Sequence, residues 1–146
     1  MNFNSTRGNT PPASIDQALV AGLAPDGGLY VPERIPAPTV QPGATLADTA
    51  HAVLAPYFAD SSLRESLAAI CEHAYSFPAP LRGMAGEGDH LLELFHGPTA
   101  AFKDYAARFL AESLSRLRPQ DAAPTTILVA TSGDTGAAVA AAFHRR

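Results

Sequence analysis

The sequence predicts an α/β protein in two parts, a small α+β domain over residues 1–84 and the start of a parallel-sheet domain over residues 85–146. Apolar residues recur at helical spacing in two consecutive stretches between 45 and 75, which predicts a pair of packed helices. After residue 89 the pattern becomes strand, helix, strand, helix, which is typical of a parallel sheet. The glycine-rich, acidic stretch 83–89 between these patterns predicts the domain boundary.

The first thirty residues predict an arm, a short helix and a strand. Residues 1–12 are polar and end in two prolines, so we expect an extended arm and a turn. Ser14 is a suitable N-cap for a helix that Gly22 ends, because glycine accepts the left-handed conformation found after helix C-termini. The Pro-Asp-Gly-Gly run at 25–28 predicts a turn before a short strand at 29–31.

The predicted helix pair follows. Thr45 or Asp48 can begin its first helix, and Pro56 predicts a kink or an early end. The Ser-x-x-Glu spacing that starts at Ser62 is typical of a capping box, so we expect a second helix from there to about Tyr75. The expected buried stripe of this second helix is Leu63, Leu67, Ile70 and Ala74.

The second part alternates strands and helices. A strand is expected at 90–95, a helix at about 103–117 and a second strand at 125–130. Residues 125–130 are apolar and β-branched on both faces, which suits a sheet covered on both sides. An alanine-rich helix is expected to follow residue 134.

Composition excludes several classes of protein. The 146 residues are 47% hydrophobic and 16% charged with a net charge of −4, which fits a globular protein and argues against a broad nucleic-acid-binding face. The single cysteine, Cys71, excludes an intramolecular disulfide, and the five histidines lack zinc-ligand spacing, so no metal site is predicted. With no apolar signal peptide and no run of membrane-spanning length, we expect a cytoplasmic protein with no membrane partner.

The chain has a single lysine, Lys103, which stands where a helix is expected to begin. Lysine forms Schiff bases with carbonyl groups, including that of pyridoxal phosphate, and its amine must be uncharged to do so. The partial positive charge of a helix N-terminus and partial burial beside Phe95 and Phe102 would both favour the uncharged amine. A solvated surface lysine is the equally weighted alternative. The neighbouring Asp104 is expected to cap the helix or to pair outward, and His96 is a weaker candidate for the same site.

A second candidate site is the run Ser132-Gly133-Asp134-Thr135-Gly136, between the expected strand and the last helix. Backbone amides at a helix N-terminus attract an anion, and the hydroxyls of Ser132 and Thr135 can donate as well. The run lacks the Gly-Lys-Ser/Thr signature of a P-loop. An ordinary capped helix start is the structural alternative, although ligands bind at the carboxyl ends of strands in open α/β sheets.

Four segments of the chain, in order, resemble the threonine synthase family. The most distinctive is Leu92-Glu93-Leu94-Phe95-His96-Gly97-Pro98-Thr99-Ala100-Ala101-Phe102-Lys103-Asp104, because related enzymes such as cysteine synthase share the lysine but not the Phe-His-Gly-Pro-Thr run. The other three segments lie at residues 5–8, 22–32 and 130–138.

The resemblance implies a fold-type-II pyridoxal 5'-phosphate enzyme that converts O-phosphohomoserine and water to threonine and phosphate. By motif position, Lys103 would bind the cofactor covalently and later move protons, and Asp134 would lie near the 3-hydroxyl side of the cofactor. Ser132, Gly133 and Thr135 would bind the substrate carboxylate. Arg7 could reach the active site, where an arginine suits a phosphate group.

Threonine synthases are much longer than this chain, so the resemblance implies an N-terminal portion that needs the remainder of its own chain for the active site. We expect this portion alone to lack turnover and to hold pyridoxal phosphate poorly. Two alternatives stay open. One is another fold-type-II lyase acting on a phosphorylated amino acid, and the other is a noncatalytic module, derived from the enzyme, that binds a small anion or a partner.

Overall fold

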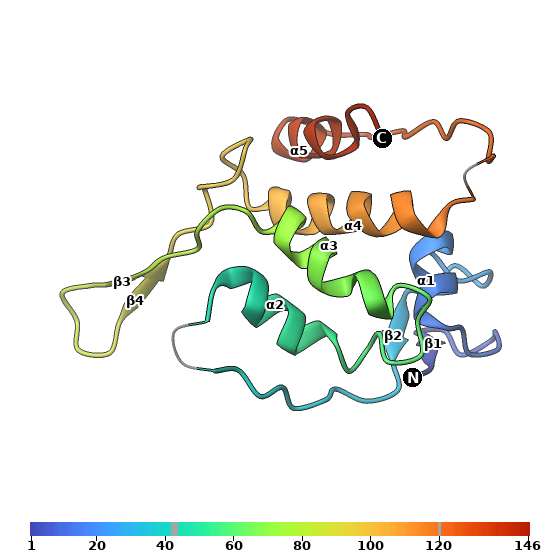
Figure 1. Ribbon diagram of the computed structural model, residues 1–146, viewed down its shortest axis with the longest axis horizontal. Helices are drawn as coiled ribbons and strands as arrows, with labels where there is room; N and C mark the ends of the chain where they lie inside the picture. The colour runs from blue at the N-terminus through green and yellow to red at the C-terminus, as the bar shows by residue number, and fades with distance from the viewer. Residues whose placement is uncertain (42–43, 120) are drawn as a thin grey trace.

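The computed structural model describes residues 1–41, 44–119 and 121–146, and Figure 1 shows its helices between two short β-ribbons that lie on opposite sides of the view. In chain order the elements are β1 (Phe3–Ser5), α1 (Ile15–Ala21), β2 (Tyr30–Pro32), α2 (Leu46–Leu54), the 3-10 turn η1 (Arg64–Ser66), α3 (Leu67–Ala74), β3 (Leu81–Gly83), β4 (His90–Leu92), α4 (Lys103–Leu117) and α5 (Asp134–Phe143). Each helix of the described residues falls short of the length and apolarity that a bilayer span requires.

Local sequence signals set the ends of the first two helices, as predicted. Ser14 caps α1 in a capping box with Gln17, and Gly22 follows the helix at φ 71°. Thr45 caps α2 in the same way with Asp48. The helix α2 ends at Leu54, before Pro56, so the expected early end is confirmed.

The capping box predicted at Ser62 is wrong. The chain passes through η1 before α3 begins at Leu67, and neither element has a side-chain cap. The reason is a tertiary contact, because the Asp16 carboxylate of α1 accepts hydrogen bonds from the Ser61 hydroxyl and from the Ser62 amide, the latter at 2.9 Å. Burial raises the pKa of Asp16, but these hydrogen bonds together outweigh it and hold the pKa below its ordinary value.

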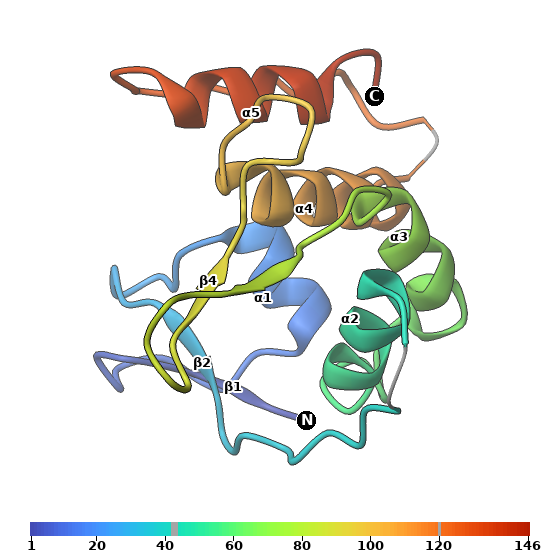
Figure 2. The same cartoon turned by 90° about the vertical axis from the view of Figure 1, so that its left-hand side faces the viewer.

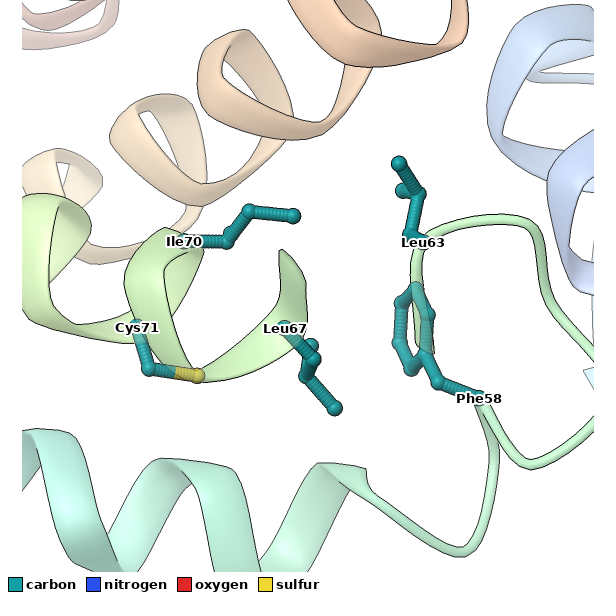
Figure 3. Packing of buried hydrophobic residues seen from close by; sticks show 5 residues of the cluster. All are labelled: Phe58, Leu63, Leu67, Ile70 and Cys71. Carbon is teal, nitrogen blue, oxygen red and sulfur yellow. The ribbon is translucent and has the colours of Figure 1, made fainter. Parts of the chain in front are cut away.

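The hydrophobic core lies where α3 and the loop before it meet α2 and α4. Figure 3 shows its five fully buried side chains between the ribbons of α2 and α4. The expected buried stripe is confirmed, since each of its four residues is at most 2% exposed, although Leu63 lies before α3. Burial raises the pKa of Cys71 to about 11, so this thiol behaves as a small hydrophobic side chain. The core residues are Phe58, Leu63, Leu67, Ile70 and Cys71.

The helix α4, predicted as part of the second domain, packs on the first. Phe109 lies edge-on to Phe58 with ring centroids 6.0 Å apart, and it stacks on Tyr75 at 6.2 Å. The Arg108 guanidinium donates from Nε to the Ala74 carbonyl at 2.8 Å, which satisfies a carbonyl at the end of α3. The boundary predicted between residues 84 and 85 falls in the turn of the β3–β4 hairpin, and the division into two domains stays a prediction.

The predicted parallel sheet is not formed among the described residues. The strand predicted at 90–95 is shortened to β4, which pairs antiparallel with β3, Leu81 opposite Leu92. Residues 125–130 are extended and exposed without a sheet partner, and Leu128 is 89% exposed. A buried parallel strand needs hydrogen-bonded neighbours on its edges, and the described strands supply none. The other ribbon joins β1 to β2, antiparallel, with the buried Phe3 opposite Pro32.

Candidate functional site

The two sequence motifs lie at the same end of two parallel helices, where each helix begins. Figures 1 and 2 show α4 and α5 side by side and running in the same direction. Their contact consists mostly of alanines, Ala107 and Ala111 with Ala138 and Ala142, whose small side chains allow close approach. Because the helices are parallel, their first residues, Lys103 and Asp134, lie at the same end of the pair.

The amine of Lys103 has no ion-pair partner among the described residues. Lys103 is the first residue of α4 and is partly buried. Its Nζ lies 3.3 Å from the centroid of the Phe102 ring, and no carboxylate of the described residues lies within ion-pair distance of it. An aromatic face is a weakly attractive neighbour that forms no covalent or ionic bond with the amine. The amine can therefore leave the ring without breaking an ion pair.

The neighbouring Asp104 differs from both readings of the sequence, because its carboxylate is buried and turned back on the preceding loop. Its oxygens accept hydrogen bonds from the Thr99 amide at 2.9 Å and from the Thr99 hydroxyl at 2.8 Å. Asp104 is 1% exposed. The residue therefore closes the loop before α4 and does not pair outward.

The hydroxyl of Thr131 caps α5. Its Oγ1 accepts hydrogen bonds from the Gly133 amide at 3.1 Å and the Gly136 amide at 3.2 Å. Ser132, Gly133 and Asp134 are exposed and Thr135 is partly exposed. The hydrogen bonds of the described residues leave the Ser132 hydroxyl and the Asp134 and Thr135 amides free. Free amides and hydroxyls at a helix start attract an anion.

Arg7 lies apart from Lys103 and the α5 motif. Its Nη1 donates to the Asp26 carbonyl at 2.9 Å, next to the β1–β2 ribbon. The helix α1 packs beside the far end of α4, where Val20 lines a groove with Leu114 and Arg118. The 1.5 Å rise per residue separates the two ends of α4 by roughly 20 Å. The structure brings Lys103 and the α5 motif to one end of α4 and does not bring Arg7 there.

Two of the resembling segments meet around the Asp26 carboxylate. It accepts hydrogen bonds from the Ser5 hydroxyl at 2.6 Å, the Gly28 amide at 2.9 Å and the Asn9 amide at 3.0 Å. The Ser5 hydrogen bond is the main cause that holds the pKa of Asp26 below its ordinary value. Gly28 is required here, since a Cβ at this position would lie 2.1 Å from the Ser5 hydroxyl oxygen. This cluster is a structural joint between residues 5–9 and 26–28.

His96 forms a pair with Glu93, its Nε2 lying 2.7 Å from Oε2. This hydrogen bond is the main cause that lowers the pKa of Glu93. His96 is therefore occupied by a carboxylate that lies on its own loop.

An apolar groove of about 460 Å³ runs between α5 and the extended segment before it. Lys103 does not line it. Its walls include Ile127, Val129, Val139 and Phe143, which suit packing against other apolar side chains.

Sequence reasoning missed two residues at the site. Thr131 was named only as part of the resembling segment 130–138, while Ser132 and Thr135 were expected to donate hydrogen bonds to an anion. Thr99 was named only as part of the resembling run. The spacing of Thr99 and Asp104, which turned out to join loop and helix, carries no standard capping signature and could not be recognised from the sequence.

The residues present fit pyridoxal phosphate together with an anionic substrate. An unpaired primary amine lies at the start of α4, and free amides and hydroxyls lie at the start of the adjacent α5. The first group can bind a carbonyl and the second can bind an anion.

Comparisons with known proteins point the same way. A family model described as the threonine synthase N terminus matches residues 2–75. The chain is 40% identical to a threonine synthase of Pseudomonas aeruginosa over 94% of this chain and 31% of that protein, and 39% identical to one of Haemophilus influenzae over 99% and 34%.

Solved structures agree. A PLP-bound threonine synthase from Brucella melitensis matches with a TM-score of 0.88 and 38% identity, over 100% of this chain and 33% of that one. The Escherichia coli enzyme matches with a TM-score of 0.81 and 35% identity, over 99% and 34%. The chain thus spans about a third of the length of these relatives.

Proposed function

The chain belongs to the threonine synthase family, and from this premise we propose that it is the N-terminal part of an enzyme that uses pyridoxal phosphate to convert O-phosphohomoserine and water to threonine and phosphate. The observation that carries the proposal is the unpaired amine of Lys103 at the start of α4, at the same end of the α4–α5 pair as the free amides of α5.

The site residues of the α4–α5 pair are proposed to act as follows. Lys103 binds the cofactor through Nζ and afterwards accepts and returns protons at the same nitrogen. When bound, the cofactor supplies an electron sink that stabilises negative charge on the substrate carbon. Ser132, Gly133 and Thr135 hold the substrate carboxylate by hydroxyl and amide hydrogen bonds. Asp134 would lie near the 3-hydroxyl side of the cofactor.

Arg7 is proposed to bind the substrate phosphate, because its guanidinium has five N–H donors and only one hydrogen bond from that group, to the Asp26 carbonyl, is found among the described residues. This role requires that the assembled enzyme bring the β1–β2 ribbon to the substrate. If Arg7→Ala raises KM for O-phosphohomoserine and leaves the rate of pyridoxal phosphate capture unchanged, the role is supported. Equal KM values for O-phosphohomoserine in the wild type and in Arg7→Ala would contradict it.

We also propose that residues 1–84 and 85–146 are two domains, and that the second is completed by the rest of the enzyme. The groove beside α5 and the unpaired segment 125–130 support this, since both expose apolar surface that a sheet would cover. The 146-residue chain alone is then expected to give no threonine and only a weak absorbance band with pyridoxal phosphate. A strong band together with turnover would contradict this proposal.

Covalent trapping tests the assignment of Lys103. The full-length protein is incubated with pyridoxal phosphate, reduced with borohydride and mapped by peptide mass spectrometry. We expect the label on Lys103 and its loss in Lys103→Ala. A label on the Met1 amine alone would favour a noncatalytic module, and higher activity on O-acetylserine than on O-phosphohomoserine would favour another lyase.

A further inference from the structure

The Asp104 carboxylate is the most buried charged group of the described residues, at 1% exposure. The ion pairs of the described residues include none to it, in contrast to Glu112, which is 4% exposed and contacts Arg116 and Arg146. Its partners are the amide and hydroxyl of Thr99. Burying a carboxylate is costly unless it is hydrogen-bonded, so this one arrangement is strongly preferred.

The loop between Gly97 and α4 is built around that carboxylate. A Cβ at Gly97 would lie 2.4 Å from Asp104 Oδ2, so the backbone at this position approaches the side chain as closely as only glycine allows. Ala100 has a left-handed φ of 56°, and its amide donates to the Gly97 carbonyl at 3.0 Å. A left-handed non-glycine residue is strained and persists only where its surroundings hold it.

Lys103 lies in the sequence between Thr99 and Asp104, the two residues that this hydrogen bonding joins. It is preceded by the loop that Asp104 holds and followed by Asp104 itself. Adjacent residues on a helix point in directions about 100° apart, so Asp104 can face the loop while Lys103 faces elsewhere. Any shift of the Asp104–Thr99 contact moves the backbone that carries the amine.

We propose that Asp104 is a positioning residue for Lys103: by holding Thr99 it fixes the loop 97–102, and through it the direction from which the Lys103 amine meets the cofactor. The inference rests on the proposed function of Lys103. Asp104 itself touches neither cofactor nor substrate in this role.

The chain offers a matched control at the start of α2. Asp48 is also a first-turn aspartate that accepts hydrogen bonds from a threonine amide and hydroxyl, those of Thr45, at 3.1 and 2.6 Å. Asp48 is exposed and belongs to the helix pair of the first part of the chain, and no lysine lies next to it in the sequence. The variants Asp104→Asn and Asp48→Asn therefore make the same chemical change at two first-turn aspartates that each accept hydrogen bonds from a threonine.

The experiment uses the full-length enzyme and four variants: Asp104→Ala, Asp104→Asn, Thr99→Val and Asp48→Asn. Three quantities are measured: kcat and KM on O-phosphohomoserine, the rate at which the apoprotein captures pyridoxal phosphate, and the borohydride label on Lys103. We expect Asp104→Ala to lower kcat and the capture rate by about 10- to 100-fold with KM within about twofold, because a misplacement near 1 Å costs that much. Asp104→Asn keeps one acceptor and should be intermediate, and Asp48→Asn should stay within about twofold of the wild type.

Thr99→Val keeps the Thr99 amide and the side-chain shape, so it tests the proposal even if Asp104→Ala fails to fold. It should lower the capture rate by about 3- to 10-fold. Capture rates and kcat in Thr99→Val and Asp104→Asn that equal those of Asp48→Asn would overturn the inference. Failure of the wild-type enzyme to be labelled on Lys103 would instead overturn the proposed function, so the two failures are distinguishable.

Discussion

The helical core buries its apolar side chains, whereas the later layer, which comprises the loop before α4, residues 125–130 and α5, leaves several of them exposed. In the core, Phe58, Leu67 and Ile70 are at most 2% exposed and lie among side chains from four helices. In the later layer, Phe102 is 59% and Leu128 is 89% exposed. The first region completes its packing from its own sequence, while the second presents apolar side chains for which the described residues provide no cover.

The attachment of α5 shows the same difference. Its buried contacts with α4 come from alanines, which bury little area, and one charged contact adds to them: Arg146 donates to the Glu112 carboxylate at 2.6 Å. Hydrophobic stabilisation scales with the apolar area buried, so α5 is held more weakly than α3. The candidate site thus joins a well-anchored helix, α4, to a weakly anchored one.

Truncation of a core side chain should have the largest effect. Leu67→Ala is expected to lower the free energy of unfolding of the chain by about 2–5 kcal/mol, because it leaves a cavity among large side chains. The matched variant Leu128→Ala should change it by less than about 0.5 kcal/mol, since that side chain is already in water. Urea unfolding followed by circular dichroism measures both. Similar losses in the two variants would mean that residues 125–130 are buried, and the comparison of the two regions would fail.

Acidification should loosen the attachment of α5 next. Burial raises the pKa of Glu112, but hydrogen bonds from Arg146 and Arg116 outweigh it and lower the pKa from 4.5 to about 2. A carboxyl group with a lowered pKa in the folded state stabilises the fold above its ordinary pKa and loses that contribution as the pH falls. We therefore expect the free energy of unfolding to drop by up to about 3 kcal/mol between pH 4.5 and pH 2.

Glu112→Gln should flatten this pH dependence, while Glu65→Gln should retain it, because the Glu65 side chain is 95% exposed. Unfolding free energies measured at several pH values in both variants test the assignment. An unchanged slope in Glu112→Gln would assign the acid sensitivity to other carboxyl groups.

The sequence predicted those features that depend on neighbours close in the chain. Ser14, Thr45 and Gly22 mark helix ends by local hydrogen bonding and backbone conformation, and α4 was predicted over its full observed length. The predictions failed where distant residues decide. The Ser62 amide donates to Asp16 and therefore does not take part in the expected capping box. Residues 125–130 form no strand, because the described residues provide no neighbouring strand.

The candidate site shows the same limit. The motifs located Lys103 and the α5 loop, and helix packing, which no motif encodes, brings them to one end of the α4–α5 pair. The buried Asp104 and the capping Thr131 were not recognised, because their roles depend on where a loop folds back. Arg7 was grouped with the site because it lies in a resembling segment and suits a phosphate group, and the arrangement of the helices separates it from Lys103.

A moderate effect is expected where the core region holds α4. The Arg108 guanidinium donates to the Ala74 carbonyl at 2.8 Å, to the His73 carbonyl, and to the Ser76 hydroxyl at 3.2 Å. Arg108→Lys should lower the free energy of unfolding by about 1–2 kcal/mol, because an ammonium cannot reproduce this forked geometry. Arg82→Lys is the control, since Arg82 is 67% exposed and lies 3.5 Å from Glu93. Equal stabilities of the two variants would show that α4 does not depend on the end of α3.

The smallest effect should come from the start of α5. Thr131→Val removes the oxygen that accepts from the Gly133 and Gly136 amides, and loss of a cap costs about 1 kcal/mol. The amides of these glycines should exchange their hydrogens faster, while amides in α3 should not. Thr131→Ser keeps the hydroxyl and should preserve the slow hydrogen exchange of both amides. It removes only the Thr131 methyl group, which lies 2.4 Å from where a Gly136 Cβ would be. If α5 opened no faster in Thr131→Val, its hold on α4 would have to come from the alanine contacts, and the weak anchoring inferred for the second region would be incorrect.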